Sequence, residues 1–478
     1  MTKVLPIQGS TTAAQLFFKP AVAWAGILGL IVITTLLILA GAGKFLNILF
    51  PLASLLLGVL LYYRAPSLYI ACTWWLWFLA PFVRRISDYR SSFTDPSPIL
   101  LAPFLMTSVS VITLWKYFPK AHRGGGTPFL LAIVGLIYGV LIGLINKSPF
   151  AAAKDFLDWT TPVFFGFHLF THWQQYPAHR KTMERVFTWA ILGMGIYGIF
   201  QFISLPAWDD QWLTNSQLES AIVESQNDST QKTVRVWATM QSGEPFSAFM
   251  AGGLLLLLIS KGPLPLPASI VGYLSFLLAM VRSGWLGWAA GALTLVSSLR
   301  PKFQVRLVLL MLALGLCLVP LANMEPFATS INERLNSFSN VEDDASAQSR
   351  QASNAAFAAR AMTSVIGDGL GGGSIDSAIF ATLFNLGWLG TLPYMGSILI
   401  LIWKLFQNSP GTRDPFVGVA RAIVITVVIR MPLNGSNTGA SGLLLWTFLA
   451  LGLAAIRYHQ WNLQGRLNDP VTPPGSSL

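Results

Sequence analysis

The chain has 478 residues, of which only 11% are charged and 53% are hydrophobic. A soluble domain carries about 25% charged residues, so this composition excludes an ordinary soluble enzyme, a secreted disulfide scaffold and a disordered chain. The formal net charge of +11 would suit a nucleic-acid-binding protein if the charges were spread over one surface. Their order along the sequence indicates instead how the chain is oriented in a membrane.

Long apolar runs account for the shortage of charge, because a helix of about 20 apolar residues crosses the hydrocarbon core of a bilayer. We predict about fourteen such helices, within a range of roughly twelve to fourteen. The fold class is therefore an all-α polytopic membrane protein. In chain order the predicted spans lie near residues 22–41, 45–63, 67–83, 99–115, 129–146, 156–173, 185–205, 246–260, 264–281, 284–299, 304–322, 385–405, 416–433 and 438–456.

The spans divide the chain into membrane and non-membrane parts. The apolar run at 22–40 is too long for a cleaved signal peptide, so it is read as an uncleaved first span. The predicted parts are a cytoplasmic N-terminus (1–21), N-terminal transmembrane helices (22–205), an extracytoplasmic loop (206–245), further transmembrane helices (246–322), a large extracytoplasmic loop with an amphipathic helix (323–384), C-terminal transmembrane helices (385–456) and a partly disordered cytoplasmic tail (457–478).

The charges predict the orientation of the chain. The two long loops hold most of the acidic residues, whereas short loops on the opposite side are basic, as in the segments 116–123, 180–185 and 300–306. Basic loops remain in the cytoplasm, so both termini are expected there and both long loops outside. The net charge of +11 then records membrane orientation, and no nucleic-acid partner is expected.

Arginines on the predicted outer side need a reason to be there. Arg282 lies in the tight turn Val-Arg-Ser-Gly-Trp between two spans, and Arg235 precedes another span. An arginine close to hydrocarbon costs a few kcal/mol unless it reaches the headgroups or an anion. Arg282 therefore has two interpretations, which are snorkelling to lipid headgroups and a bidentate grip on a phosphate. For Arg235 the alternative is simple solvation.

The second long loop carries further candidates. Residues 346–365 place apolar side chains at helical spacing, flanked by Arg350 and Arg360, and a glycine run at 369–373 ends this amphipathic helix. The glycines lack the strand and the Gly-Lys-Ser/Thr of a nucleotide loop, although they permit close backbone approach. Asp376 follows, either as a helix-start residue or as a general base.

A pair of acidic residues, Asp155 and Asp158, lies at the outer end of the 156–173 span. We expect them to pair with Lys154 or Lys147, and lining an outer cavity is the alternative. The sequence offers no metal site, because Cys72 and Cys317 lie inside apolar spans and the histidines form no ligand pattern.

Taken in order, the segments from about 230 to 455 resemble the O-antigen ligase and polymerase family of bacterial membrane glycosyltransferases. The matching stretches are the Arg235 segment, the Val-Arg-Ser-Gly-Trp turn, and the outer-loop sequences Glu333-Arg334-Leu335 and Asp344-Ala-Ser-Ala-Gln-Ser-Arg350. The sequences Gly-Asp-Gly-Leu-Gly-Gly-Gly and Leu-Gly-Trp-Leu-Gly complete the pattern. The N-terminal half matches only as a set of apolar spans.

The resemblance implies a GT-C-like membrane enzyme of the bacterial inner membrane. Its donor would be an oligosaccharide on undecaprenyl pyrophosphate, its acceptor a glycan or lipid A-type hydroxyl, and its other partners membrane lipids. Arg235, Arg282 and Arg350 occupy the positions that would bind the pyrophosphate, with Arg334 and Arg360 as secondary candidates, and Asp376 as the base. No cofactor, nucleotide or metal is implied.

The chain departs from the better-known ligases at one point. They carry a histidine shortly after the glycine-rich stretch, where this sequence has Asp376. This difference favours a polymerase-like member slightly over a ligase. The alternative from another class is a multi-span transporter of a small solute or ion. Transporters concentrate charge near the midplane and repeat their broken helices in pairs, whereas here the spans 22–41, 246–260 and 438–456 lack charge.

Overall fold

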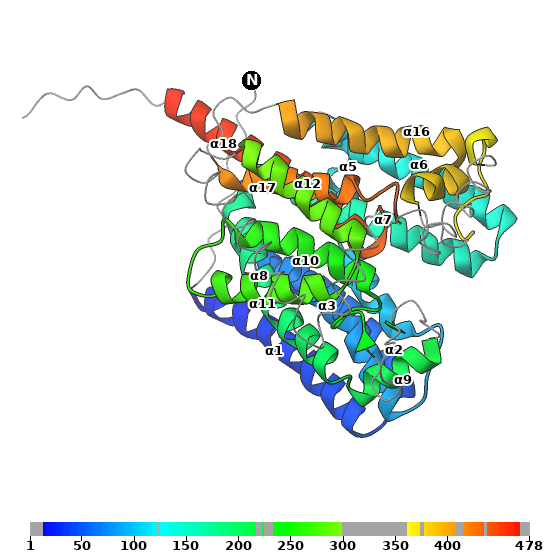
Figure 1. Ribbon diagram of the computed structural model, residues 1–478. Coiled ribbons are helices and arrows are strands. Elements are labelled where there is room, and N and C mark those ends of the chain that lie inside the picture. Colours follow the sequence, from blue (N-terminus) through cyan, green and yellow to red (C-terminus); the bar gives the residue numbers. More distant parts are fainter. Residues whose placement is uncertain are drawn as a thin grey trace, which may run out of the picture. The chain divides into compact units, whose positions relative to one another are not determined.

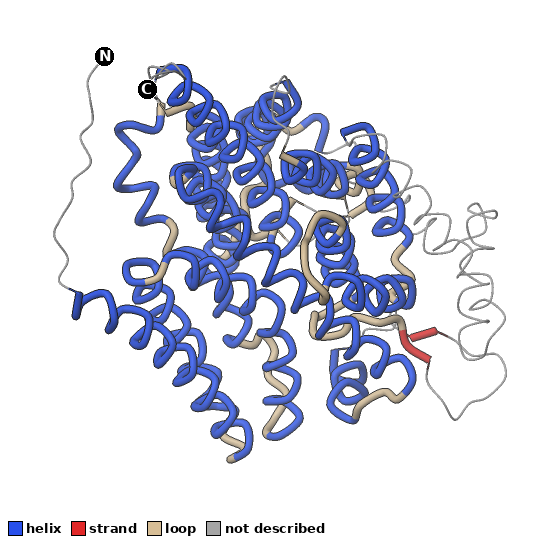
Figure 2. Tube along the Cα trace, turned by 90° about the vertical axis from the view of Figure 1, so that its left-hand side faces the viewer, coloured by secondary structure: helices blue, strands red, loops and turns tan. Residues whose placement is uncertain are grey.

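The computed structural model describes residues 13–122, 124–216, 222–223, 233–298, 361–372, 377–407, 414–434 and 437–468. These residues form helices almost throughout, and the strands among them are a two-residue antiparallel pair, β1 (Ile222–Val223) and β2 (Thr233–Val234). Figure 2 shows this helical architecture with its single strand pair. The all-helical class predicted from the apolar runs is confirmed.

The helices group into two compact units, residues 1–109 and 110–478. The first unit contains α1 (Ala13–Leu39), α2 (Gly43–Arg64), α3 (Pro66–Arg90), the 3₁₀ helix η1 (Pro98–Leu101) and α4 (Ala102–Ser108). Pro66 at the start of α3 and Pro98 at the start of η1 occupy first-turn positions, where a missing N–H costs nothing.

The second unit contains the remaining helices. They are α5 (Val111–Ala121), α6 (Thr127–Asn146), α7 (Pro149–Thr171), η2 (Trp173–Gln175), α8 (Tyr176–Ile203), α9 (Ala207–Ser216), α10 (Gly243–Leu257), α11 (Pro265–Leu278), α12 (Arg282–Ser298), α16 (Ala378–Gln407), α17 (Pro415–Val428) and α18 (Gly439–Asn468). In Figure 1, α16 runs beside α6, and the two helices are in contact.

Eight helical segments within the described chain are long and apolar enough to cross a membrane, and α10, α11 and α17 are shorter apolar helices. The chain is thus a multi-pass membrane protein in architecture. Each predicted span coincides with a described helical stretch except 304–322, which lies outside the described residues. The number of about fourteen crossings stays a prediction.

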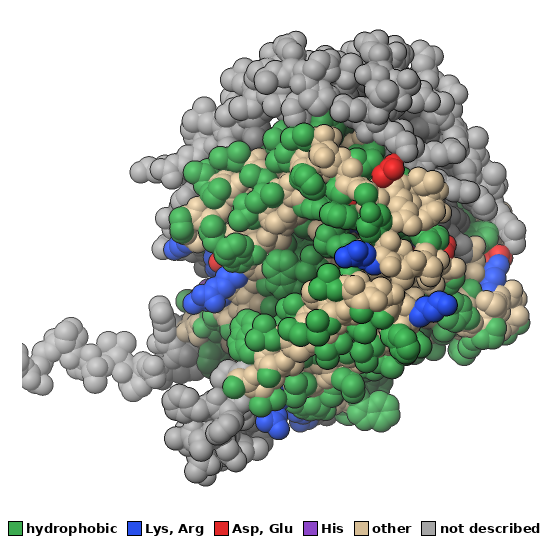
Figure 3. Space-filling model, turned by 90° about the horizontal axis from the view of Figure 1, so that it is seen from below, with side chains coloured by type: hydrophobic (Ala, Val, Ile, Leu, Met, Phe, Trp, Pro, Cys, Tyr) green, Lys and Arg blue, Asp and Glu red, His purple; other side chains and the backbone are tan. Residues whose placement is uncertain are grey.

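Within the second unit, burial separates inner helices from outer ones. In α18, 89% of the most apolar stretch is buried, whereas in α16 the corresponding share is 39%. Exposed surfaces carry large apolar side chains such as Trp115, Leu36 and Leu399. Figure 3 shows one face covered mainly by hydrophobic side chains, with scattered charged ones. So many exposed large apolar side chains are unusual on a soluble monomer, and a lipid environment explains them.

One structural feature was not expected from the sequence, namely a break inside α16. Gly387 adopts φ 58° and ψ −174°, which interrupts the helix. The segment 361–372, called the strap below, lies in this break, where the N–H groups of Trp388 and Leu389 donate to the carbonyls of Ser364 and Val365. A Cβ at Gly387 would come within 2.4 Å of the strap nitrogen at Gly367. The helix therefore opens to bind the strap.

Helix ends in the second unit gather into two sets. The end of α11, the starts of α10 and α12 and the end of α17 meet around Arg430, a region called the Arg430 end. The starts of α8 and α17 and the C-terminal part of α18 meet around Asp414, called the Asp414 end. The Arg430 end contains the segments predicted to be outside, and the Asp414 end contains those predicted to be cytoplasmic.

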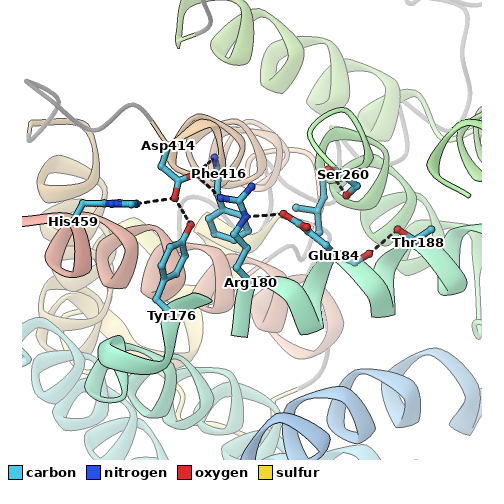
Figure 4. Close-up of polar contacts among 9 residues, drawn as sticks. Tyr176, Arg180, Glu184, Thr188, Ser260, Asp414, Phe416 and His459 are labelled. Carbon is cyan, nitrogen blue, oxygen red and sulfur yellow. Dashed lines mark hydrogen bonds and ion pairs between the residues drawn. The ribbon is translucent and has the colours of Figure 1, made fainter. Parts of the chain in front are cut away.

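Asp414 joins three helices through a closed polar cluster (Figure 4). Its carboxylate accepts hydrogen bonds from the Tyr176 hydroxyl (2.6 Å), Arg180 Nη1 (2.7 Å) and His459 Nε2 (2.9 Å). It also caps α17 by accepting from the Phe416 N–H at 3.0 Å. Arg180 Nε donates a second hydrogen bond, to Glu184 Oε1 at 2.7 Å. Because these groups satisfy one another, the cluster is a structural joint.

The pKa of Asp414 supports a test of this joint. Burial alone would raise the pKa of the carboxyl, but the hydrogen bonds from Tyr176, His459 and Phe416 and the charge of Arg180 hold it below its ordinary value. A depressed folded-state pKa stabilises the fold above the unfolded-state pKa of about 4. This contribution is lost as the pH falls through the folded-state value.

Replacing Asp414 by asparagine is therefore expected to destabilise the protein by roughly 1–3 kcal/mol at pH 7, since hydrogen bonds to a charged group are lost. Thermal unfolding in detergent at several pH values measures this. The difference between the two proteins should shrink below about pH 4. A difference that is absent at pH 7 would show that Asp414 does not stabilise the joint.

Candidate anion-binding site

The Arg235 segment is fixed to the end of α8 by one glutamine. Gln201 Oε1 accepts hydrogen bonds from the N–H groups of Trp237 (3.1 Å) and Ala238 (2.9 Å). Its Nε2 donates to the fully buried Asp209 at 2.6 Å, which orients the amide. Arg235 is half-buried, and its Nε is buried without a hydrogen-bond partner among the described residues. The backbone therefore holds Arg235 at the Arg430 end with donor capacity unused.

Arg282 lies on the neighbouring turn. It is the first residue of α12 and is half-buried, so its side chain extends from a fixed helix start. The two arginine segments are joined directly, because the Val236 N–H donates to the Leu278 carbonyl at 3.0 Å. Leu278 is the last residue of α11. The sequence placed Arg235 and Arg282 on one side of the membrane, and the structure brings their segments together.

Backbone strain marks the same two turns. The non-glycine residues with positive φ in the described chain are Ala238 (φ 47°) and Met280 (φ 54°). Ala238 lies three positions after Arg235, and Met280 lies two positions before Arg282. Such conformations cost about 1–3 kcal/mol each and persist where the surroundings enforce them, often at ligand sites. The turns are thus held in shapes that the local sequence alone disfavours.

Arg430 is the most buried cation of this region. It follows α17 and has no exposed surface. Nη2 donates to Oε1 of Glu244 at 2.7 Å and approaches the Glu244 carbonyl at 3.3 Å. Nε and Nη1 are buried and have no partner among the described residues. Gly287 permits this position, since a Cβ there would lie 2.8 Å from Arg430 Cδ.

Further unpaired polar atoms surround the arginines. Asn434 donates to Ser283, next to Arg282, at 3.2 Å, while its own Oδ1 is buried and unpaired. The hydroxyls of Thr239 and Ser247 are buried without partners within the described chain. Leaving a buried polar group unpaired costs about 1–3 kcal/mol, and native proteins pair almost all such groups. The unpaired guanidinium nitrogens are charged donors that an anion can satisfy.

The other predicted site residues cannot be placed. Arg350, Arg334, Arg360 and Asp376 lie outside the described residues. Among the residues that the structure describes, no group of three or more His, Cys, Asp or Glu side chains could hold a metal ion.

Sequence reasoning missed Arg430 and Glu244 as a site pair. Arg430 was visible as a basic residue on the predicted outer side, and Glu244 as one acid of the first outer loop. Nothing in the sequence joined them, because 186 positions separate them. The only local signal was an arginine at the end of a strongly apolar span, which is costly unless it has a function.

Comparison of the chain with protein-family models, with curated proteins and with solved structures finds no match in any of the three.

Proposed function

We propose that the protein is a membrane glycosyltransferase of cell-surface polysaccharide assembly. It transfers or polymerises glycan from an undecaprenyl-pyrophosphate-linked donor on the outer face of the bacterial inner membrane, with both termini in the cytoplasm. The observation that carries this proposal is the set of buried, unpaired guanidinium nitrogens of Arg235 and Arg430 beside the Arg282 turn. A lipid-linked pyrophosphate combines the two properties that such a site in an apolar helical protein requires, namely negative charge and a membrane anchor.

The arginines would act on the leaving group. In glycosyl transfer the acceptor oxygen bonds to the anomeric carbon while the bond from that carbon to the pyrophosphate oxygen breaks. The electron pair of the broken bond stays on the pyrophosphate, so negative charge develops there. Guanidinium groups fixed before the reaction stabilise that charge without reorganising. Arg430 is fixed by Glu244 and Gly287, and the other two by strained turns.

The family resemblance supplies the remaining parts of the proposal. Arg350 would complete the pyrophosphate site, with Arg334 and Arg360 near it, and Asp376 would accept the proton of the acceptor hydroxyl. A GT-C-like fold would hold these groups. The absence of a histidine after the glycine run favours a polymerase-like enzyme, whose acceptor is another glycan, over a ligase, whose acceptor is lipid A-type.

Purified protein in lipid nanodiscs tests the proposal. With an undecaprenyl-pyrophosphate-linked oligosaccharide as donor, we expect longer lipid-linked glycans together with released undecaprenyl pyrophosphate, without added nucleotide. A gel sizes the glycans, and chromatography detects the carrier. Unchanged donor, combined with solute uptake when the protein is placed in sealed liposomes, would contradict the proposal and support the transporter alternative.

A further inference from the structure

A second polar cluster lies where the strap crosses the start of α7. The Gly371 N–H donates to Asp155 Oδ2 at 2.8 Å, and Lys147 Nζ pairs with Asp368 of the strap at 3.2 Å. Lys147 therefore does not pair with the α7 acids, because Asp368 of the strap takes it. Lys154, the other expected partner, acts on both Asp155 and Asp158 through its charge. A glycine-rich backbone can approach α7 closely enough to bond Asp155.

Asp158 is left with a different environment. It lies one helical turn after Asp155, is half-buried, and accepts a hydrogen bond from the Thr438 side chain. A Cβ at Gly439 would lie 2.9 Å from Asp158 Oδ1, so the start of α18 lies directly against the carboxylate. Asp158 forms no ion pair with any residue that the structure describes. Lone pairs of its carboxylate therefore stay available to a proton donor.

An unpaired acceptor lies across the strap from Asp155. Asn385 of α16 is 2% exposed, and its Oδ1 has no hydrogen-bond partner in the described chain. A Cβ at Gly372 would be 3.1 Å from this oxygen, which places it beside the strap residue that follows Gly371. The unused groups here are acceptors, whereas the unused guanidinium nitrogens of Arg235 and Arg430 are donors. An acceptor-lined site suits a ligand that donates hydrogen bonds, such as a sugar hydroxyl.

The α17–α18 loop connects this cluster to the arginine site. Asn434 donates a hydrogen bond to Ser283, which is next to Arg282. Asn437 Nδ2 donates to the Thr382 hydroxyl at 2.8 Å, and Thr382 lies one helical turn before Asn385. Thr438, the residue after Asn437, contacts Asp158. The three peptide units between Asn434 and Asn437 span at most about 11 Å. The Asp158 cluster and the arginine site therefore contact the two ends of one short loop.

We propose that Asp158, in place of Asp376, is the catalytic residue that takes the proton of the acceptor's sugar hydroxyl, an inference that rests on the proposed function. The acceptor O–H bond breaks as its oxygen bonds to the anomeric carbon. The proton passes to the Asp158 carboxylate, and the electron pair of the broken carbon–oxygen bond leaves on the pyrophosphate. Asp158 later releases the proton to solvent. The reaction is a substitution, so no oxidant, reductant or further reactant is needed.

Asp158→Asn tests the inference, because asparagine keeps the size of the side chain and can still accept from Thr438. General-base assistance contributes roughly 10²–10⁴ in rate, so turnover should fall at least about 100-fold while binding of radiolabelled undecaprenyl pyrophosphate stays within about twofold. In the wild-type protein, turnover should decline toward acid pH as the base is protonated, and this decline should vanish from the residual activity of the variant. A merely structural role would leave the shape of the pH profile unchanged.

Asp155→Asn is the matched control, since its amide oxygen can still accept the Gly371 N–H from one turn away on the same helix. It should keep turnover within about threefold. Wild-type turnover in Asp158→Asn, or an unchanged pH profile, would overturn the role of Asp158. Loss of turnover in Asp376→Asn together with normal turnover in Asp158→Asn would assign the proton to Asp376. A wild-type protein that binds undecaprenyl pyrophosphate no better than undecaprenol would instead contradict the proposed function itself.

Discussion

Replacing Arg430 by methionine is expected to lower glycosyl transfer at least about 100-fold while leaving the protein folded. Methionine fills a similar apolar volume and removes the fully buried charge of the pair, so no uncompensated charge stays buried. The Glu244 side chain is 38% exposed, so water can solvate it once its partner is gone. The loss of activity follows because a fixed donor to the developing charge typically contributes a factor of 10²–10³.

Replacing the acidic partner, Glu244, should instead destabilise the protein. Glu244→Gln leaves the fully buried Arg430 without its counter-charge, which costs about 3 kcal/mol or more when a buried pair is broken. Its thermal unfolding temperature in detergent should fall, and added inorganic pyrophosphate should raise it more than in the wild type, because the anion replaces the missing charge. Normal transfer by Arg430→Met would show that Arg430 is not part of the anion site. An unfolding temperature of Glu244→Gln that does not respond to pyrophosphate would show the same.

Arg282→Ala is expected to reduce transfer by roughly 10²–10³ with little change in stability. Arg282 is half-buried and is the first residue of α12, so its replacement removes no side chain from the interior of the helix. Removing it should therefore cost the leaving-group interaction and leave the helix intact. Initial rates with the lipid-linked donor, measured beside thermal unfolding, give both quantities.

Arg90→Ala is the control for the snorkelling interpretation. Arg90 is exposed in the last turn of α3, on the same predicted side of the membrane, and should be dispensable for transfer. Equal losses in the two variants would indicate that both arginines only anchor the protein to headgroups.

The fold was predictable from the sequence as far as hydrophobic length decides it. Apolar runs near 20 residues dictate helices in a bilayer, and the helices lie where these runs are. The break of α16 at Gly387 was not predictable, because it depends on the strap binding between two halves of one helix. The glycine run at 369–373 suggested close approach, but which backbone it meets depends on tertiary structure.

The candidate site was predictable only in part, for a similar reason. An arginine in a tight turn, such as Arg282, is visible locally because its position is costly. Arg430 becomes informative only when its burial, its link to Glu244 and its unpaired nitrogens are seen together. The partners of Asp158 were likewise not predictable from the sequence. Sequence spacing suggested Lys154 or Lys147 as partner. Lys147 instead pairs with the strap, Lys154 acts on Asp158 only through its charge, and the carboxylate faces Thr438 and Gly439.

The central claim is that the Arg430 end binds a lipid-linked pyrophosphate. The most direct test measures binding of undecaprenyl pyrophosphate and of uncharged undecaprenol to the purified protein in nanodiscs, with Arg430→Met beside the wild type. We expect the wild type to bind the pyrophosphate at least tenfold more tightly than the alcohol, a difference of about 1.4 kcal/mol or more, and we expect the variant to lose that preference. Equal affinity of the wild type for the two lipids, or an unchanged preference in the variant, would contradict the claim.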